Sequence, residues 1–219
     1  LKQIKKGGKM KVNYKRAMKK QQKTNLELVR SSSPTVKMRE KLKREANRMQ
    51  VSERAIFNLF RTSPTFRKIM ASKANRQSVH EQTFWVALKA TLGTEHVTKL
   101  PVAGKNAVYL EKGKMVAAED KSPWNLSKSL DFKVEIAGNT FLICHKYTRQ
   151  EGGSQDNQYA DVQALLLQAR GCQKAHVIAV CDGEYYNQDR MKNLKKHFTT
   201  KKVHVCKSED LEDLIVNLC

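Results

Sequence analysis

The chain has 219 residues and a formal net charge of +21 at pH 7, from 42 Lys and Arg against 21 Asp and Glu. This charge sets the protein apart from ordinary near-neutral soluble enzymes. The sequence lacks the run of about 20 apolar residues that a membrane-spanning helix requires, which predicts a cytoplasmic protein without membrane attachment.

The excess positive charge is concentrated at the N-terminal end of the chain. Residues 1–76 carry 23 Lys and Arg against four Glu, whereas residues 77–219 have a net charge of only +2. Each phosphate that a basic residue neutralises releases bound counterions, so a polarised basic segment suits a polyanion. The pattern predicts nucleic-acid binding, with DNA as the expected partner; a solvated basic tail is the alternative interpretation.

Within the basic third, residues 1–24 are rich in Lys and poor in large apolar residues, which predicts a flexible arm. Residues 25–76 form a basic helical region. Helix-start signals predict one helix over 34–49 after Ser33, a second after Ser52, and a third after Ser63 and Pro64.

The stretch from residue 41 to residue 63 resembles a helix-turn-helix motif. Small Ala46 lies in its first helix, and Ile56, Leu59 and Phe60 form the expected inward face of its second helix. In such a motif the second helix enters the major groove, where Arg and Asn bind base edges. The residues then free to contact DNA are Lys43, Arg44, Arg54, Asn58 and Arg61. A plain helical bundle is the alternative.

Residues 77–219 predict a separate α/β domain. A helix over 78–92 ends at Gly93 and precedes four strands near 107–110, 115–118, 130–136 and 140–147. A helix over 159–170, a strand over 175–181, a helix over 188–197, a strand over 203–206 and a helix from Ser208 follow. This order predicts a mixed sheet. The five cysteines contain no CxxC pair, which argues against a disulfide framework and a structural zinc site.

Asp131 and Lys146 are the candidate catalytic residues of this domain. Asp131 opens one apolar strand, and Lys146 stands near the end of the next, so the two can meet across a hairpin or strand pair. Divalent-metal phosphodiester hydrolysis uses such a pair: the carboxylate holds Mg²⁺ against the phosphate, while the lysine orients water and offsets developing charge.

With Leu130-Asp131 followed by Cys144-His145-Lys146, the sequence resembles the PD-(D/E)XK nuclease superfamily, and within it the type II restriction endonucleases. The resemblance implies a restriction-endonuclease-like α/β (α+β) core with a mixed sheet, preceded by the basic helical DNA-binding region. It also implies a Mg²⁺-dependent, sequence-specific endonuclease for double-stranded DNA, a symmetric homodimer, and a prokaryotic or viral origin.

The sequence departs from the family pattern at Cys144, where an acidic residue is expected and a soft thiol binds Mg²⁺ poorly. The missing acid then comes from Glu81 or Glu135, or from Glu151 or Asp156 in the following loop. The expected metal ligands are Asp131, Glu81 and the main-chain carbonyl of Cys144, and Glu81 and Glu135 join Asp131 and Lys146 in the catalytic set. The alternative is a non-catalytic DNA- or RNA-binding protein with a degenerate nuclease-like domain.

The segment from Arg149 to Tyr159 is the last candidate contact region. It contains a Gly-Gly pair and many amide groups, and it follows Lys146 directly. Side chains at this position could contact bases or phosphates. The candidates are Arg149, Gln155, Asn157 and Gln158. A solvated connecting loop, with Asp156 or Asn157 capping the next helix, is the alternative.

Overall fold

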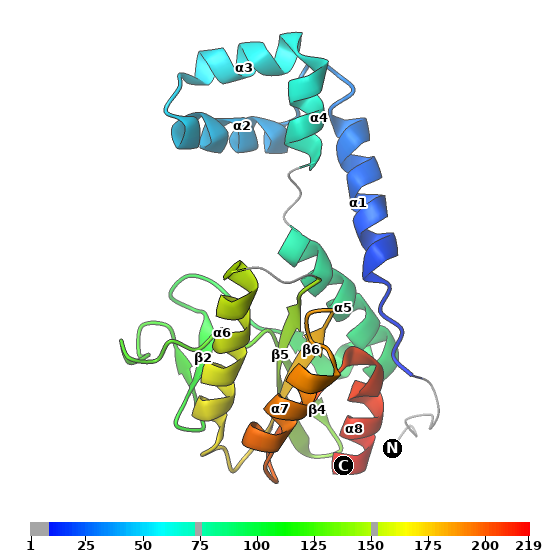
Figure 1. Cartoon of the computed structure of the whole chain (residues 1–219), viewed down its shortest axis with the longest axis vertical. Helices are drawn as coiled ribbons and strands as arrows, with labels where there is room; N and C mark the ends of the chain where they lie inside the picture. The colour runs from blue at the N-terminus through cyan, green and yellow to red at the C-terminus, as the bar shows by residue number, and fades with distance from the viewer. Residues whose placement is uncertain (1–8, 73–75, 150–152) are drawn as a thin grey trace. The chain divides into compact units, whose positions relative to one another are not determined.

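The structure is a computed structural model, and it describes residues 9–72, 76–149 and 153–219. The chain divides into two compact units (Figure 1). A helical unit comprises Asn13–His80, and an α/β unit comprises Glu81–Cys219 with the described residues before Asn13. The boundary lies close to the one predicted at residue 77, within a single helix. No helix among the described residues is long and apolar enough to cross a membrane.

The helical unit contains α1 (Tyr14–Leu28), α2 (Val36–Met49), α3 (Glu53–Thr62), α4 (Pro64–Ser72) and the start of α5 (Arg76–Leu92). Side-chain oxygens cap α2, α3 and α4, because Thr35, Ser52 and Ser63 each accept a hydrogen bond from the N–H three residues further on. The predicted helix starts at Ser52 and Ser63 are confirmed. The first of the three predicted helices begins at Val36, two residues later than expected.

Helix α1 corrects the expectation of a flexible arm over 1–24. Asn13 caps the helix through its side-chain oxygen, which accepts from the N–H of Arg16 at 2.9 Å. Tyr14 is buried, and Ala17, Met18 and Gln21 on the same helical face are half-buried. This spacing of three to four residues gives even a Lys-rich segment a face that can pack. Residues 1–8 lie outside the described residues.

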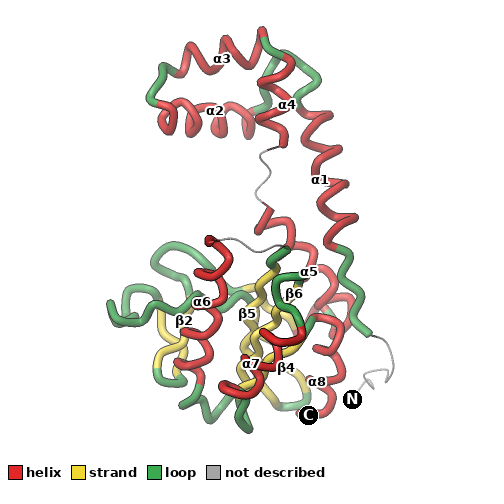
Figure 2. Tube along the Cα trace, in the orientation of Figure 1, coloured by secondary structure: helices red, strands yellow, loops and turns green. Residues whose placement is uncertain are grey.

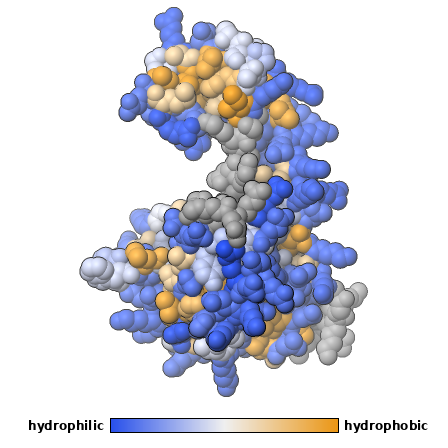
Figure 3. Space-filling model, in the orientation of Figure 1, coloured by the Kyte–Doolittle hydropathy of each residue, from blue (hydrophilic) through white to orange (hydrophobic). Residues whose placement is uncertain are grey.

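The core of the helical unit is small and apolar. It consists of Val29, Met38, Leu42, Ala46, Ile56, Phe60 and Met70. Ala46, Ile56 and Phe60 occupy the inward positions that the sequence predicts. Leu59 does not, because its side chain is 40% exposed. Figure 3 shows an exposed apolar patch over the region of α2 and α3, surrounded by hydrophilic side chains.

The α/β unit contains all the described strands (Figure 2). A five-stranded sheet has the order β1 (Val97–Lys99), β4 (Phe132–Ile136), β5 (Asn139–Tyr147), β6 (His176–Asp182) and β7 (Val203–Cys206). The first three strands are antiparallel, and β5, β6 and β7 are parallel. The prediction of a mixed sheet is confirmed. Strands β2 (Val108–Glu111) and β3 (Lys114–Ala117) instead form a separate hairpin, and three-residue β1 was not predicted.

The turn between β4 and β5 sets the register of the hairpin that carries the candidate site. Ala137 and Gly138 both have positive φ, at 50° and 77°. Two successive residues of this kind form the tight turn whose twist suits a hairpin. Ile136 therefore pairs with Asn139, and Phe132 pairs with Ile143.

Helices cover both faces of the sheet. Buried side chains of α6 (Gly153–Ala169) and α7 (Gln188–Phe198), such as Leu166 and Leu194, share one core cluster with Leu142 and Cys144 of β5. His145 stacks on Phe84 of α5, with ring centroids 4.2 Å apart. Neighbouring residues of a strand point to opposite faces, so α5 covers the face opposite α6 and α7. The chain ends with η2 (Ser208–Asp210) and α8 (Leu211–Leu218).

Candidate functional site

Asp131 lies immediately before β4, where the pairing between β4 and β5 opens. The backbone N–H of Asp131 still donates to the carbonyl of Ile143. The next hydrogen bond between the two segments is made by the Asp131 side chain and not by its backbone. The carboxylate accepts a hydrogen bond from the N–H of His145 at 2.7 Å. Asp131 is only 1% exposed, so its negative charge lies in the protein interior. A buried carboxylate of this kind requires a positive partner.

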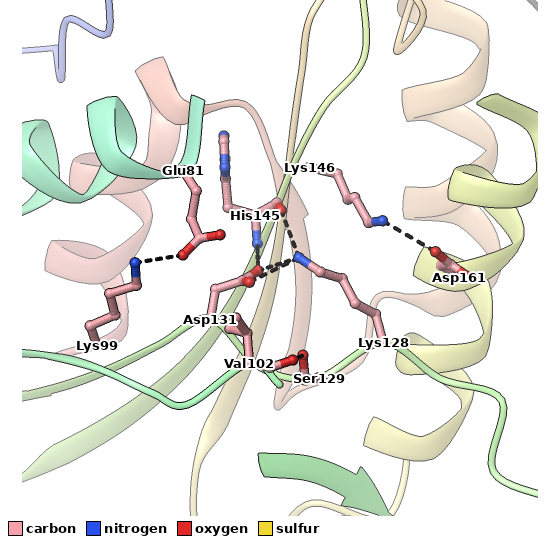
Figure 4. Close-up of polar contacts among 9 residues, drawn as sticks. All are labelled: Glu81, Lys99, Val102, Lys128, Ser129, Asp131, His145, Lys146 and Asp161. Carbon is pink, nitrogen blue, oxygen red and sulfur yellow. Dashed lines mark hydrogen bonds and ion pairs between the residues drawn. The ribbon is translucent and has the colours of Figure 1, made fainter. Parts of the chain in front are cut away.

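Lys128 provides that partner (Figure 4). Its Nζ lies 2.9 and 2.7 Å from the two carboxylate oxygens of Asp131, and 3.2 Å from the main-chain carbonyl oxygen of His145. Burial alone would lower the pKa of Lys128, but the neighbouring carboxylates of Asp131 and Glu81 raise it above its ordinary value. The ammonium is therefore charged at neutral pH, and three oxygen atoms from two segments gather around it.

His145 is held rigidly from two sides. Its ring stacks on Phe84 with an interplanar angle of 10°, and its Nε2 lies 3.3 Å from a carboxylate oxygen of Asp182. Asp182 is itself buried at the end of β6 and accepts from the N–H of Ser208 at 3.0 Å. Since the His145 side chain points toward α5, its main-chain groups remain available to Asp131 and Lys128.

Lys146 follows on the other face of β5 and pairs with a residue that the sequence analysis did not consider. Its Nζ lies 3.2 Å from a carboxylate oxygen of Asp161, in the third turn of α6 (Figure 4). The Lys146 side chain is 9% exposed, whereas that of Asp161 is 43% exposed. An acid that is half accessible and positioned by a buried lysine can still contact a ligand from solvent.

Cys144 does not supply a charge to this group. Burial raises the pKa of its thiol to about 11, although Lys128 and Lys146 oppose this shift. The thiol is therefore neutral at physiological pH, unlike the acid that the family pattern places there. The carbonyl that reaches the Lys128 ammonium belongs to His145, one residue beyond the Cys144 carbonyl expected from the sequence.

The two glutamates predicted as third acids have different surroundings. Glu81 on α5 is close enough to contribute to the raised pKa of Lys128, while its carboxylate pairs with Lys99 at 2.8 Å. Glu135 is exposed, forms an ion pair with Lys133 at 2.7 Å, and lies opposite Thr140 near the hairpin turn. The structure therefore brings Glu81 toward Asp131 and leaves Glu135 apart.

The polar segment after β5 is helical rather than a loop over most of its length. Helix α6 begins at Gly153, six residues before the predicted start at Tyr159. Asp156 in its first turn suits the positive end of the helix dipole and accepts from the Tyr185 hydroxyl at 2.7 Å. Gln158 accepts from the Thr148 hydroxyl at 2.9 Å, and Asn157 and Arg149 are exposed. Glu151 and the Gln155 side chain lie outside the described residues.

The residues predicted to contact DNA from the helical unit all lie on its surface. They are Lys43, Arg44, Arg54, Asn58 and Arg61. Lys43 forms an ion pair with Glu53 at 3.5 Å, in which both side chains are more than half exposed. Such a pair contributes little to stability and is easily replaced by a phosphate contact. The turn between α2 and α3 is tight, with Gln50 in the left-handed region at φ 53°.

Two of the important residues, Lys128 and Asp161, were missed because their roles depend on tertiary contacts. Lys128 lies three residues before Asp131, so a search of the residues preceding the strand could have found it. Asp161 lies 15 residues after Lys146, on a helix whose start was predicted too late. Once α6 is extended to Gly153, Asp161 lies eight residues after the start of this helix, in its third turn.

The Mg²⁺ site predicted from the sequence would have to use the oxygen atoms that surround the Lys128 ammonium. No group of three or more His, Cys, Asp or Glu side chains suited to a metal ion occurs among the residues that the structure describes. However, Mg²⁺ is often held by one or two carboxylates together with water and substrate phosphates. The Asp131 carboxylate and the His145 carbonyl already converge on one positive charge, and Glu81 lies nearby. A Mg²⁺ ion could bind these oxygens only in place of the Lys128 ammonium.

Comparison with known proteins yields no family for this chain. Neither a protein-family model nor a curated protein sequence matches it. Among solved structures, the crystal structure of protein VC1899 from Vibrio cholerae is similar, with a TM-score of 0.34 and 11% sequence identity. The match covers 94% of this chain and 54% of that one, so the chain spans about half the length of the Vibrio protein. A likeness of this degree supports no functional assignment.

Proposed function

We propose that the protein is a Mg²⁺-dependent endonuclease that cleaves double-stranded DNA, of the type II restriction kind. The observation that carries the proposal is the convergence of Asp131 and the His145 carbonyl on a single cation position at the end of β5. Hard oxygen ligands of this kind are typical of magnesium sites that act on phosphates. Lys146 follows at the next position of the same strand.

Each residue has a distinct role in this proposal. Asp131 and the carbonyl of His145 would hold the metal, with Glu81 as a further carboxylate, and the bound metal would supply charge stabilisation at the scissile phosphate. Lys146 stabilises negative charge that develops on the phosphate and orients the attacking water. Asp161 keeps the Lys146 ammonium in place at 3.2 Å and is exposed enough to accept a proton from water.

The helical unit supplies binding in the same proposal. In this proposal its exposed Lys and Arg side chains contact phosphates, and α3, the second helix of the helix-turn-helix-like pair, reads base edges. Cleavage of a palindromic site would further require two copies of the chain, because a symmetric site is cut by a symmetric dimer.

Plasmid cleavage tests the proposal directly. Supercoiled and linear DNA of mixed sequence are incubated with the full chain in Mg²⁺ or Mn²⁺, with EDTA as the metal-free control. We expect discrete fragments, and we expect Asp131→Asn or Lys146→Met to slow cleavage by at least about 100-fold. A gel shift in Ca²⁺ should show that both variants bind DNA within about twofold of the parent protein.

Glu135→Gln is the matched control, since it removes an acidic residue from the same strand but outside the site. It should cleave at the parent rate. Uncut DNA with every metal, or cleavage that survives Asp131→Asn, would contradict the proposed chemistry.

A non-catalytic nucleic-acid-binding protein is the second candidate. Two observations favour it: the Cys144 thiol is neutral where the family pattern has an acid, and Lys128 already neutralises Asp131. The same experiments separate the two candidates, because this second function requires a gel shift without cleavage under any metal condition.

A further inference from the structure

The segment between β3 and β4 exposes two large apolar side chains close to the candidate site. Trp124 is 89% exposed and Leu126 is 79% exposed. Asn125, which lies between them, and Ser127, which follows Leu126, are buried. The alternation means that the backbone here is held with every second side chain directed to solvent. A tryptophan that stays exposed does not gain the stabilisation that burial of its large apolar ring would give, and exposed apolar surface of this kind often marks a binding site.

Asn125 fixes this segment to the hairpin β2–β3. Its side-chain Nδ2 donates to the carbonyl of Leu110 at 2.7 Å, and its Oδ1 accepts from the N–H and the hydroxyl of Ser127 at 3.0 and 2.6 Å. Ser122 adds a second attachment, because its N–H donates to the carboxylate of Glu111 at 2.9 Å. The exposed Trp124 ring is therefore presented from an anchored backbone.

The chain distance from Trp124 to the site is short. Lys128 lies four positions after Trp124 in the chain, and four residues of extended chain span at most about 14 Å. Successive base pairs of duplex DNA are about 3.4 Å apart along one strand. A nucleotide that contacts Trp124 therefore lies within a few steps of a phosphate held at Asp131.

The chemistry of the segment favours a base as the occupant. Lys121 lies over the Tyr109 ring at 4.6 Å and donates to the carbonyl of Asn125, so one positive charge is attached to the backbone of this segment. Two acidic residues, Glu119 and Asp120, precede it, so the charge of the segment does not by itself select a polyanion. The indole ring offers a flat surface on which a nucleic-acid base can stack, and the short chain distance to Asp131 makes a base the occupant that fits the proposed function.

We propose that Trp124 stacks on a nucleobase and holds the nucleic-acid strand beside the candidate cleavage site, with Leu126 packing against the same nucleotide. This inference rests on the proposed nucleic-acid binding but does not require cleavage. It assigns a contact in the α/β unit that is independent of phosphate charge, whereas the basic residues of the helical unit act through phosphates.

Tryptophan fluorescence tests the inference because the chain has only two tryptophans. Trp85 is half-buried beside Lys89, so Trp85→Phe leaves Trp124 as the single reporter. This protein is titrated in EDTA with single- and double-stranded DNA, and with an abasic strand of the same length and charge. We expect the base-containing strands to quench and shift Trp124 emission, and the abasic strand to leave it unchanged.

Affinity measurements on Trp124→Ala give the second readout. A stacked base corresponds to about a 5- to 150-fold loss of affinity on substitution with alanine. Trp124→Ala should therefore bind the base-containing strands more weakly than the parent protein by an amount in this range, and it should bind the abasic strand as well as the parent does. Trp124→Phe, which keeps an aromatic ring, should retain most of the parent affinity. Met115→Ala, which removes another half-exposed apolar side chain of the same unit, is the matched control and should bind normally.

The outcomes separate this inference from the proposed function. DNA binding with unquenched Trp124 emission and an unchanged Kd for Trp124→Ala overturns the inference and leaves the proposed function standing. Equal quenching by an acidic polypeptide also overturns it, since the segment would then bind a protein. Quenching by bases without any cleavage supports the inference while the proposed chemistry fails, and the absence of all DNA binding overturns both.

Discussion

Residues 13–80 carry 18 Lys and Arg against four Glu, whereas residues 81–219 carry 19 against 17. The basic residues of the helical unit that were predicted to contact DNA lie on its surface, and the core beneath it is apolar. In the α/β unit, the buried carboxylate of Asp131 is instead paired with the partly buried ammonium of Lys128. Surface charges act at a distance on a polyanion, while a buried pair fixes atoms at defined positions. The two units therefore use the same residue types for different purposes.

The largest effect should come from removing one member of the buried pair. Lys128→Met leaves Asp131 buried without its partner, which should lower the free energy of unfolding by about 3 to 5 kcal/mol. Mg²⁺ or Mn²⁺ can then bind the released oxygens, so both metals should raise the Tm of Lys128→Met by more than that of the parent protein, in which the metal must displace the Lys128 ammonium. Thermal unfolding with and without metal measures both effects.

Two control variants sharpen this result. Lys133→Met breaks an exposed ion pair with Glu135 and should cost less than about 1 kcal/mol. The double variant Lys128→Met, Asp131→Asn removes both charges of the pair and should recover much of the lost stability without any response to metal. If metal stabilises the double variant as strongly as Lys128→Met, the cation does not bind at Asp131.

The next effect concerns the surface of the helical unit. Replacing Lys43, Arg44, Arg54 and Arg61 with Gln should weaken DNA binding by about 100-fold at physiological salt. It should also reduce the slope of log affinity against log salt by about 2 to 4 units, because each phosphate contact contributes about 0.9. Filter binding over a range of salt concentrations measures both quantities.

A matched variant removes four exposed lysines from the α/β unit, at Lys105, Lys114, Lys174 and Lys201. It loses the same charge and should change the slope by less than one unit. Equal slopes for the two variants would show that binding depends on net charge alone, and would remove the distinction between the units.

A smaller effect is expected from pH. Burial, with contributions from His176 and Lys202, lowers the pKa of His204 to about 4. Since the folded pKa lies below the ordinary value of 6.5, the unfolded chain binds the proton more readily, and stability falls as the pH drops from about 6.5 toward 4. We expect a loss of about 1 kcal/mol that His204→Gln abolishes, measured by urea unfolding at pH 7 and pH 5. An unchanged pH dependence in His204→Gln would assign the effect to another group.

The smallest effect should be that of Cys144. Because its thiol is neutral, Cys144→Ala should alter the cleavage rate by less than about threefold, apart from a modest loss of stability. Cleavage assays at a temperature well below the Tm measure the rate. A loss as large as that of Asp131→Asn would make the thiol part of the metal site.

The sequence predicted those features that depend on neighbouring residues. Ser52 and Ser63 cap helices as expected, and the turn at Ala137 and Gly138 joins the predicted strands, because caps and turns are decided within a few residues. Leu59 was placed inward by its spacing alone, yet it is 40% exposed because the small core is filled by other side chains.

The site was predicted only in part for the same reason. The apolar strands that hold Asp131 and Lys146 were visible as periodic runs. The partners of these residues, Lys128 and Asp161, depend on how β4 diverges from β5 and on where α6 begins. Neither feature leaves a periodic signal in the sequence, so packing decides which charges meet.

The position of Lys128 also bears on how the protein folds before it meets any metal. Many metal sites consist of carboxylates that repel one another until the ion arrives, and such domains unfold when a chelator removes it. Here the chain brings its own counterion to Asp131, three residues away in sequence. Folding of the α/β unit can therefore be completed on the ribosome or in a chelating buffer, and the protein should be purified intact in EDTA.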